Sequence, residues 1–143
     1  MNDIYKTIAK PSEGFFKDRG SKFYAFAFPV STDDDVSLFR EQIKKKYHDA
    51  RHHVYAFVMG INKDKYRASD DGEPANSSGP PVLNAIKSFD LTNVLVIVVR
   101  YFGGKKLGIP GLINAYRTAA EDALSNAQII EKTAGTKISL SFV

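Results

Sequence analysis

The 143-residue sequence contains no cysteine. Without a thiol the chain can form neither a disulfide framework nor a thiolate zinc site, and a reducing compartment fits better than a secreted one. Long apolar runs are absent too, because the longest, Val94 to Val99, is far below the roughly 20 residues of a membrane-spanning helix. The first ten residues show no apolar signal core. We therefore expect a cytoplasmic protein with no membrane partner.

The motifs of several common enzyme and metal sites are also absent. Gly108 is followed by Ile109 and Pro110, where a P-loop requires Lys and then Ser or Thr, and no glycine precedes it by two positions as the dinucleotide fingerprint requires. The sequence has no Gly-x-Ser-x-Gly elbow and no EF-hand ladder. His52 and His53 would point to opposite faces of a strand, so they cannot chelate one ion together. We expect no metal and no cofactor.

The composition is that of an ordinary globular domain. Its hydrophobic content of 43% and charged content of 25% match a globular domain, whereas a disordered chain has fewer apolar residues, and its length is close to that of one domain. The 20 Lys and Arg outnumber the 16 Asp and Glu, which gives a formal net charge of +4. This balance permits binding to nucleic acid but does not argue for it by itself.

Apolar patterning predicts a domain in which strands and helices are interspersed. The Asn93–Val99 segment is apolar at both alternating sets of positions, which is typical of a central strand covered on both faces. The other expected strands are two within 15–30, joined by a turn at 18–21, and a hairpin of 53–61 with 65–68. Three helices are expected. One follows the Ser31-Thr32 cap, a second begins at Pro80, and a third runs from about Pro110 to Ala127. We predict an α/β (α+β) fold, a mixed β-sheet with helices packed on it.

A glycine-rich segment, called here the basic loop, joins the expected central strand to the last helix. Its candidate site residues, for an anion or nucleic acid, are Arg100, Tyr101, Phe102, Gly103, Gly104, Lys105, Lys106, Gly108 and Gly111. Glycines let backbone amides converge, and the positive end of a helix follows them. Lys105 and Lys106 could contact phosphates while Tyr101 or Phe102 stacks on a base, unless these aromatics are core. The alternative is a tight crossover that needs no ligand.

A second candidate segment, called here the acidic turn, brings three carboxylates within four residues. It consists of Ser69, Asp70, Asp71, Gly72 and Glu73, and Pro74 follows. Crowded carboxylates can bind a hard cation or shift one another's pKa. They can also belong to an Asp-Gly turn whose acids cap amides or pair with Arg67 or Arg100. We favour this structural interpretation.

The order and spacing of five short motifs resemble the Impact family, which includes the bacterial YigZ-like proteins. The motifs are Ser21-Lys22-Phe23, Ser69 to Pro74, Arg100 to Gly104, Lys106-Leu107-Gly108 and Ala115-Tyr116. The resemblance implies a fold like the second domain of small-subunit ribosomal protein five. It also implies an Impact N-terminal-like domain at 1–132, followed at 133–143 by an edge strand or the start of a truncated ferredoxin-like domain. Asn114 departs from the family, in which an Arg is usual, and removes one charge from the expected anion site.

The resemblance also implies a role in translation. Eukaryotic relatives act in translational control by competing for the activator of the kinase that phosphorylates initiation factor two. We therefore expect a non-catalytic binding module that contacts RNA, ribosomal components or a protein partner through the acidic turn and the basic loop. The alternative is an enzyme acting on a phosphorylated small molecule, in which Asp70, Asp71 or Glu73 serves as general base or magnesium ligand.

Overall fold

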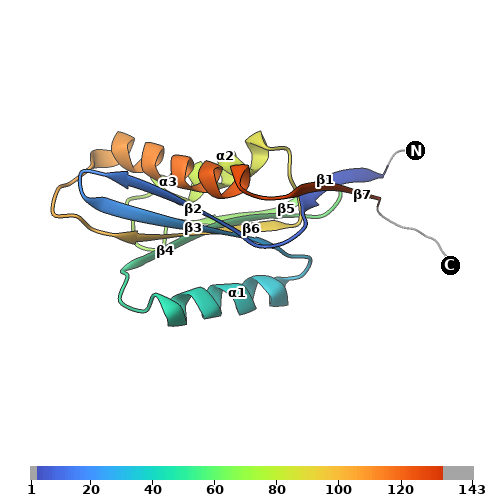
Figure 1. Cartoon of the computed structure of the whole chain (residues 1–143), viewed down its shortest axis with the longest axis horizontal. Helices are drawn as coiled ribbons and strands as arrows, with labels where there is room; N and C mark the ends of the chain where they lie inside the picture. The colour runs from blue at the N-terminus through green and yellow to red at the C-terminus, as the bar shows by residue number, and fades with distance from the viewer. Residues whose placement is uncertain (1–2, 134–143) are drawn as a thin grey trace.

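In the computed structural model, which describes residues 3–133, a five-stranded sheet lies between one helix on one face and two helices on the other (Figure 1). The strands are β2 (Ser12–Asp18), β3 (Ser21–Pro29), β4 (His52–Met59), β5 (Lys65–Ser69) and β6 (Val94–Tyr101). The helices are α1 (Asp33–Lys46), α2 (Gly79–Ser88) and α3 (Gly108–Ser125). The strand order is β2-β3-β6-β4-β5, and each of these four ladders is antiparallel. The predicted α+β class is confirmed.

Strand β6 is the centre of the sheet, as its apolar pattern predicts. It pairs with β3 on one side and with β4 on the other, and residues Val94 to Arg100 are buried. Val94, Val96 and Val98 pack with α2 and α3. The alternate residues Leu95, Ile97 and Val99 belong to the second core, on the side of α1. Both faces of β6 are therefore covered, which explains its unbroken apolar sequence.

Helix α1 begins at its predicted cap. The Thr32 hydroxyl accepts a hydrogen bond from the Asp35 amide, and the Asp35 carboxylate accepts one from the Thr32 amide, which makes a capping box. Val36 and Ile43 are buried against the sheet, and Lys44, Lys45 and Lys46 lie exposed in the last turn. Positive charge is favourable at that end of a helix.

Helix α3 packs closely on the sheet through its alanine stripe. Its buried residues include Ala115, Ala119 and Ala123, and it begins at Gly108, two residues before the predicted start. On β2, Gly14 lies so near α3 that an added Cβ would stand 2.2 Å from the Ala123 amide nitrogen. Small side chains on both partners therefore set the distance between helix and strand.

No helix within residues 3–133 is long and apolar enough to cross a membrane.

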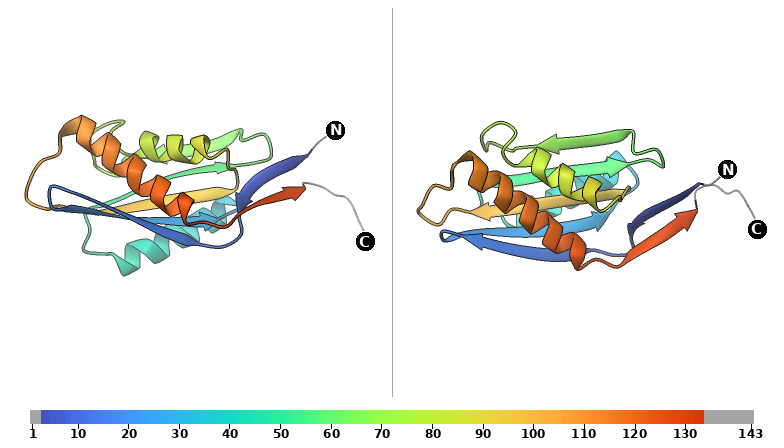
Figure 2. Two further views of the ribbon diagram at one scale, coloured as in Figure 1. Left: turned by 45° about the horizontal axis from the view of Figure 1, so that its top comes forward. Right: turned by 90° about the horizontal axis from the view of Figure 1, so that it is seen from above.

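A separate two-stranded sheet lies at the end of the molecule where the chain enters and leaves the described region (Figures 1 and 2). It pairs β1 (Ile4–Ile8) with β7 (Ile129–Thr133) in antiparallel register. The sequence patterns did not predict either strand. The expected start of a further strand or domain, at 133–143, lies outside the described residues except for Thr133.

Candidate functional site

Asp70 of the acidic turn caps helix α2. Its carboxylate accepts hydrogen bonds from the amides of Asn76 (2.8 Å), Ser78 (3.2 Å) and Gly79 (2.8 Å), and from the Ser78 hydroxyl (3.0 Å). Ser78 occupies the N-cap position, but its own side chain makes no capping bond. Partial burial raises the pKa of Asp70, but the hydrogen bonds outweigh burial and hold that pKa below its ordinary value. The Asp70 carboxylate therefore has a structural task.

Asp71 ties the same turn to strand β4. Its carboxylate accepts a 2.7 Å hydrogen bond from the His53 amide, and its carbonyl oxygen lies 2.9 Å from Nδ1 of His52. Asp71 and Gly72 both have positive φ, of 43° and 86°. The turn is therefore a tight one that Gly, Asp and Asn tolerate best.

Glu73, the last acid of the turn, forms a buried ion pair with Arg100 at the start of the basic loop. Nη1 of Arg100 donates to both carboxylate oxygens, at 3.0 and 2.8 Å, and the Tyr116 hydroxyl donates to one of them. The side chain of Glu73 is only 3% exposed. Burial, followed by the charge of Glu73, raises the pKa of Tyr116. Of the two expected arginine partners Arg100 is confirmed, whereas Arg67 lies exposed on β5.

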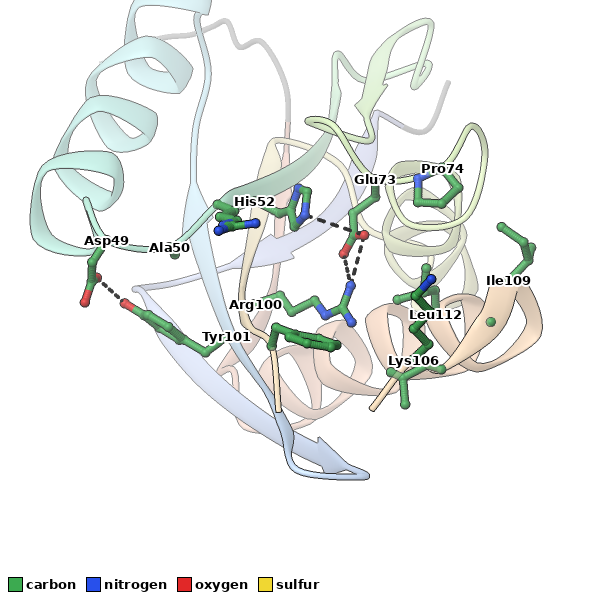
Figure 3. Close-up of a pocket in the computed structure, with 14 residues that line it drawn as sticks. Asp49, Ala50, His52, Glu73, Pro74, Arg100, Tyr101, Lys106, Ile109 and Leu112 are labelled. Carbon is green, nitrogen blue, oxygen red and sulfur yellow. Dashed lines mark hydrogen bonds and ion pairs between the residues drawn. The ribbon is translucent and has the colours of Figure 1, made fainter. Parts of the chain in front are cut away.

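A cavity of about 820 Å³ opens beside this ion pair (Figure 3). We call it the pocket. Its lining consists of Asp49, Ala50, Arg51, His52, Glu73, Pro74, Arg100, Tyr101, Phe102, Lys106, Leu107, Gly108, Ile109 and Leu112. The fold thus brings the end of the acidic turn and most of the basic loop to one place. Residues 69–72 of the turn lie outside the lining, as do Gly103, Gly104, Lys105 and Gly111.

The glycines of the basic loop have different tasks. The Gly103 amide donates to the Ser21 hydroxyl at 3.0 Å, and an added Cβ on Gly103 would stand 2.0 Å from the carbonyl carbon of Gly20. Gly103 is therefore needed for close packing of two turns. Gly104 and Gly108 have positive φ, of 92° and 74°, and Gly108 starts α3.

The two aromatics of the basic loop have opposite environments. Tyr101 is partly buried against Tyr24 and donates its hydroxyl to Asp49 at 2.7 Å. Burial, together with the bond to Asp49, raises the pKa of Tyr101 to about 12. Phe102 is 61% exposed, and its ring centroid lies 5.6 Å from Cζ of Arg100. Of these two aromatics only Phe102 therefore presents its ring to solvent, in the same loop as the exposed Lys105 and Lys106.

Sequence reasoning missed the contribution of the segment that leads into β4 and of the first residue of that strand. Asp49, Arg51 and His52 line the pocket. The sequence patterns had raised His52 only as a possible metal ligand, and Asp49 and Arg51 not at all. The useful signal is register, because His52 stands opposite Arg100 across the β4–β6 ladder. Within residues 3–133, no three His, Asp or Glu side chains gather into a metal-binding group.

Comparison with known proteins places this geometry in a family. Residues 19–124 match the Impact N-terminal domain. The IMPACT family member YvyE of Bacillus subtilis is 35% identical over 132 residues, which cover 92% of this chain and 61% of that protein. The chain thus spans about three fifths of that relative's length.

Two solved structures are also similar. The crystal structure of a hypothetical protein has a TM-score of 0.88 and 30% identity, covering 93% of this chain and 66% of that one. The two-domain translational regulator Yih1 is 28% identical, covering 85% of this chain and 47% of that one, with a TM-score of 0.49 that is too low to place residues.

Proposed function

Because the chain belongs to the Impact N-terminal domain family, we propose that it is a non-catalytic binding module associated with translation or its regulation in the cytoplasm. Its ligand in this proposal is single-stranded RNA, free or within a ribosomal component, held at the mouth of the pocket. The translational role implied by the family resemblance motivates this class of partner. The observation that carries the proposal is the exposed ring of Phe102 in the same loop as the exposed Lys105 and Lys106.

An exposed aromatic next to basic side chains is the combination that binds single-stranded nucleic acid. Bases stack on the ring, and the lysines attract the phosphates. Phe102 adds little to the core because most of its ring faces solvent, while Tyr101 is engaged with Tyr24 and Asp49. Stacking is therefore assigned to Phe102 alone.

Further positive charge extends from the pocket along the chain. Lys44, Lys45 and Lys46 lie exposed at the end of α1, and only a short segment separates them from Arg51 in the pocket lining. An RNA backbone that leaves the pocket in this direction would meet three more cations. Such contacts give affinity that falls steeply with salt and depends little on base sequence.

The state of the three acids favours binding over the enzymatic alternative. A general base needs an accessible lone pair within hydrogen-bonding reach of the substrate. Asp70 accepts from the start of α2, Asp71 accepts from the His53 amide, and Glu73 accepts from Arg100 and Tyr116. Asp70 and Asp71 also lie outside the pocket lining, and Glu73, which lines it, is held by Arg100 and Tyr116. This arrangement supports a module without catalysis.

Fluorescence anisotropy with a labelled single-stranded RNA of roughly 12 nucleotides, within the site sizes of such modules, tests the proposal. The Phe102→Ala variant should bind about tenfold more weakly at low salt, because one stacked base contributes about 1–3 kcal/mol. Phe102→Trp should retain binding. Tyr66→Ala is the matched control, since Tyr66 is an exposed aromatic on β5 outside the pocket lining.

The results of this assay distinguish RNA from a protein as the partner. If Phe102→Ala and the unmodified protein bind the RNA with equal affinity, the RNA is held by charge alone and Phe102 is not a stacking site. Absence of binding at low salt would remove RNA as the ligand. A pull-down with the unmodified protein, compared with Phe102→Ala and followed by protein identification, would then test a protein partner at the same surface.

A further inference from the structure

We propose that the pocket accommodates one nucleoside monophosphate unit, with its phosphate at the start of α3 and its base against the apolar wall. The inference rests on the proposed function and makes it more specific, because the unit can be the phosphorylated end of an RNA. A free mononucleotide offers the same chemistry. The experiment below distinguishes these two sources.

The first support is the beginning of α3. Leu107 occupies the N-cap position of this 18-residue helix and provides no side-chain capping bond. The next two amides, of Gly108 and Ile109, have no partner within the helix, and Pro110 has no amide hydrogen. Leu107, Gly108 and Ile109 all line the pocket. Two amides and the positive end of the helix dipole are therefore available to an anion there.

The second, independent support is Arg100. Its side chain is only 9% exposed, and Figure 3 shows the guanidinium reaching into the space between Glu73 and Lys106. Both bonds to Glu73 come from Nη1, whereas Nε is buried and has no hydrogen-bond partner within the described residues. A buried N–H without a partner is costly, and an Nε and Nη2 pair matches the spacing of two phosphate oxygens. Because protein atoms cover Nε, a phosphate reaches this edge only when the side chains over it shift, and its oxygen then supplies the partner that Nε lacks.

The charges around the pocket suit a phosphate despite its two acids. Glu73 is neutralised by Arg100 and receives the Tyr116 hydroxyl, while Asp49 receives the Tyr101 hydroxyl. Lys106 is exposed and lines the pocket without an ion-pair partner within the described residues. A phosphate can therefore combine Lys106, Arg100 and the helix amides in one contact set.

The rest of the lining suits a base. Phe102 and Ile109 are exposed apolar side chains at the pocket, and Leu107 and Leu112 form buried apolar wall beside them. Because Phe102 lies over the Arg100 guanidinium at 5.6 Å, a base stacked on this ring is next to the phosphate donors. A volume of about 820 Å³ also falls within the roughly 300–1,000 Å³ typical of small-ligand pockets.

Amide NMR titration of the full chain with inorganic phosphate, uridine monophosphate, adenosine monophosphate and uridine tests the site. The phosphate-bearing probes should shift the Gly108 and Ile109 resonances. Gly103 is the internal control, because its amide already has a hydrogen-bond partner in the same loop. Lys106→Ala should weaken mononucleotide binding about tenfold, as expected for loss of a charge-assisted bond. Lys10→Ala, which removes the same charge from an exposed site outside both the lining and the basic loop, should change it less than about twofold.

A second variant addresses the buried arginine. Arg100→Lys keeps a positive charge near Glu73 but removes the planar fork. It should retain the dispersed NMR spectrum of a folded protein and bind mononucleotides about tenfold more weakly. Unchanged affinity in a folded Arg100→Lys variant would overturn the assignment of the phosphate to Arg100.

Oligonucleotides with and without a terminal 5′ or 3′ phosphate separate this inference from the proposed function. Tighter binding of a phosphorylated end, lost in Lys106→Ala and kept in Lys10→Ala, supports both. Binding of mononucleotides without binding of oligonucleotides supports the pocket inference and overturns RNA as the ligand. Oligonucleotide binding that ignores the terminal phosphate, with no response to mononucleotides, overturns the inference and leaves the proposed function. Equal weakening by the two lysine variants, or no shift with any phosphate probe, also overturns the inference.

Discussion

The acidic turn and the basic loop meet at the same pocket, but their polar groups are used in different ways. In the turn, Asp70, Asp71 and Glu73 all accept hydrogen bonds from the protein itself. In the loop, Lys105, Lys106 and Phe102 face solvent. Arg100 is intermediate, because it is buried and paired through Nη1 while its Nε is unpaired.

This contrast shows that clustered charge in a sequence does not by itself locate a binding surface. Carboxylates that satisfy backbone amides stabilise a turn and a helix end. Exposed cations and an exposed ring contribute little to stability and remain available to a ligand. We therefore expect substitutions in the turn to change mainly folding, and substitutions in the loop to change mainly binding.

The largest expected effect is that of Glu73→Ala, which leaves the Arg100 charge buried without its partner. The free energy of unfolding should fall by about 3–5 kcal/mol, measured by urea denaturation. The double variant Glu73→Leu with Arg100→Met is the control, and it should lose much less because no charge remains unpaired. A loss below about 1 kcal/mol in Glu73→Ala would contradict the buried ion pair as a structural element.

Asp70→Ala should have the next largest effect, because it removes the cap of α2. We expect a loss of about 1–2 kcal/mol near neutral pH. The pKa of Asp70 in the folded protein is below its ordinary value of 3.8. Its stabilisation is therefore full above that value and disappears as the pH falls through the lower, folded-state pKa.

Urea denaturation of both proteins over this pH range checks the sign. The difference between the unmodified protein and Asp70→Ala should shrink on acidification. A difference that is constant or grows would show that the Asp70 charge is not what holds the cap.

Asp71→Ala should cost about 1 kcal/mol, through loss of the bond to the His53 amide. The positive φ at residue 71 adds strain for alanine, whereas Asn tolerates this conformation and can still accept the bond. Thermal unfolding should thus show a lower melting temperature for Asp71→Ala than for Asp71→Asn. If Asp71→Ala keeps full stability but loses RNA binding, Asp71 belongs to the binding site.

The smallest stability changes should come from the basic loop. Phe102→Ala, Lys105→Ala and Lys106→Ala should each alter the free energy of unfolding by less than about 0.5 kcal/mol, because the three side chains are exposed. Urea denaturation, carried out alongside the anisotropy assay, should show that these variants lose RNA binding while their free energy of unfolding stays the same. A destabilisation above about 1 kcal/mol in Phe102→Ala would place this ring in the core and narrow the contrast between the two regions.

Local patterns in the sequence determined much of the fold. The capping box of α1, the central strand β6 and the alanine stripe of α3 each depend on residues close in the chain. Such features are decided by short-range hydrogen bonds and by the periodicity of burial, so they can be predicted before any tertiary contact is known. Family motifs likewise pointed to the acidic turn and the basic loop as candidate segments.

Tertiary structure decided which of these residues are used and for what. Only the fold selects Arg100 over Arg67 as the partner of Glu73, occupies the Gly103 amide with Ser21, and brings His52 into the pocket. The pairing of β1 with β7 joins segments from opposite ends of the described chain. Each of these contacts depends on strand register and on the approach of distant segments. Sequence periodicity reports which face of an element is buried but not what lies against it.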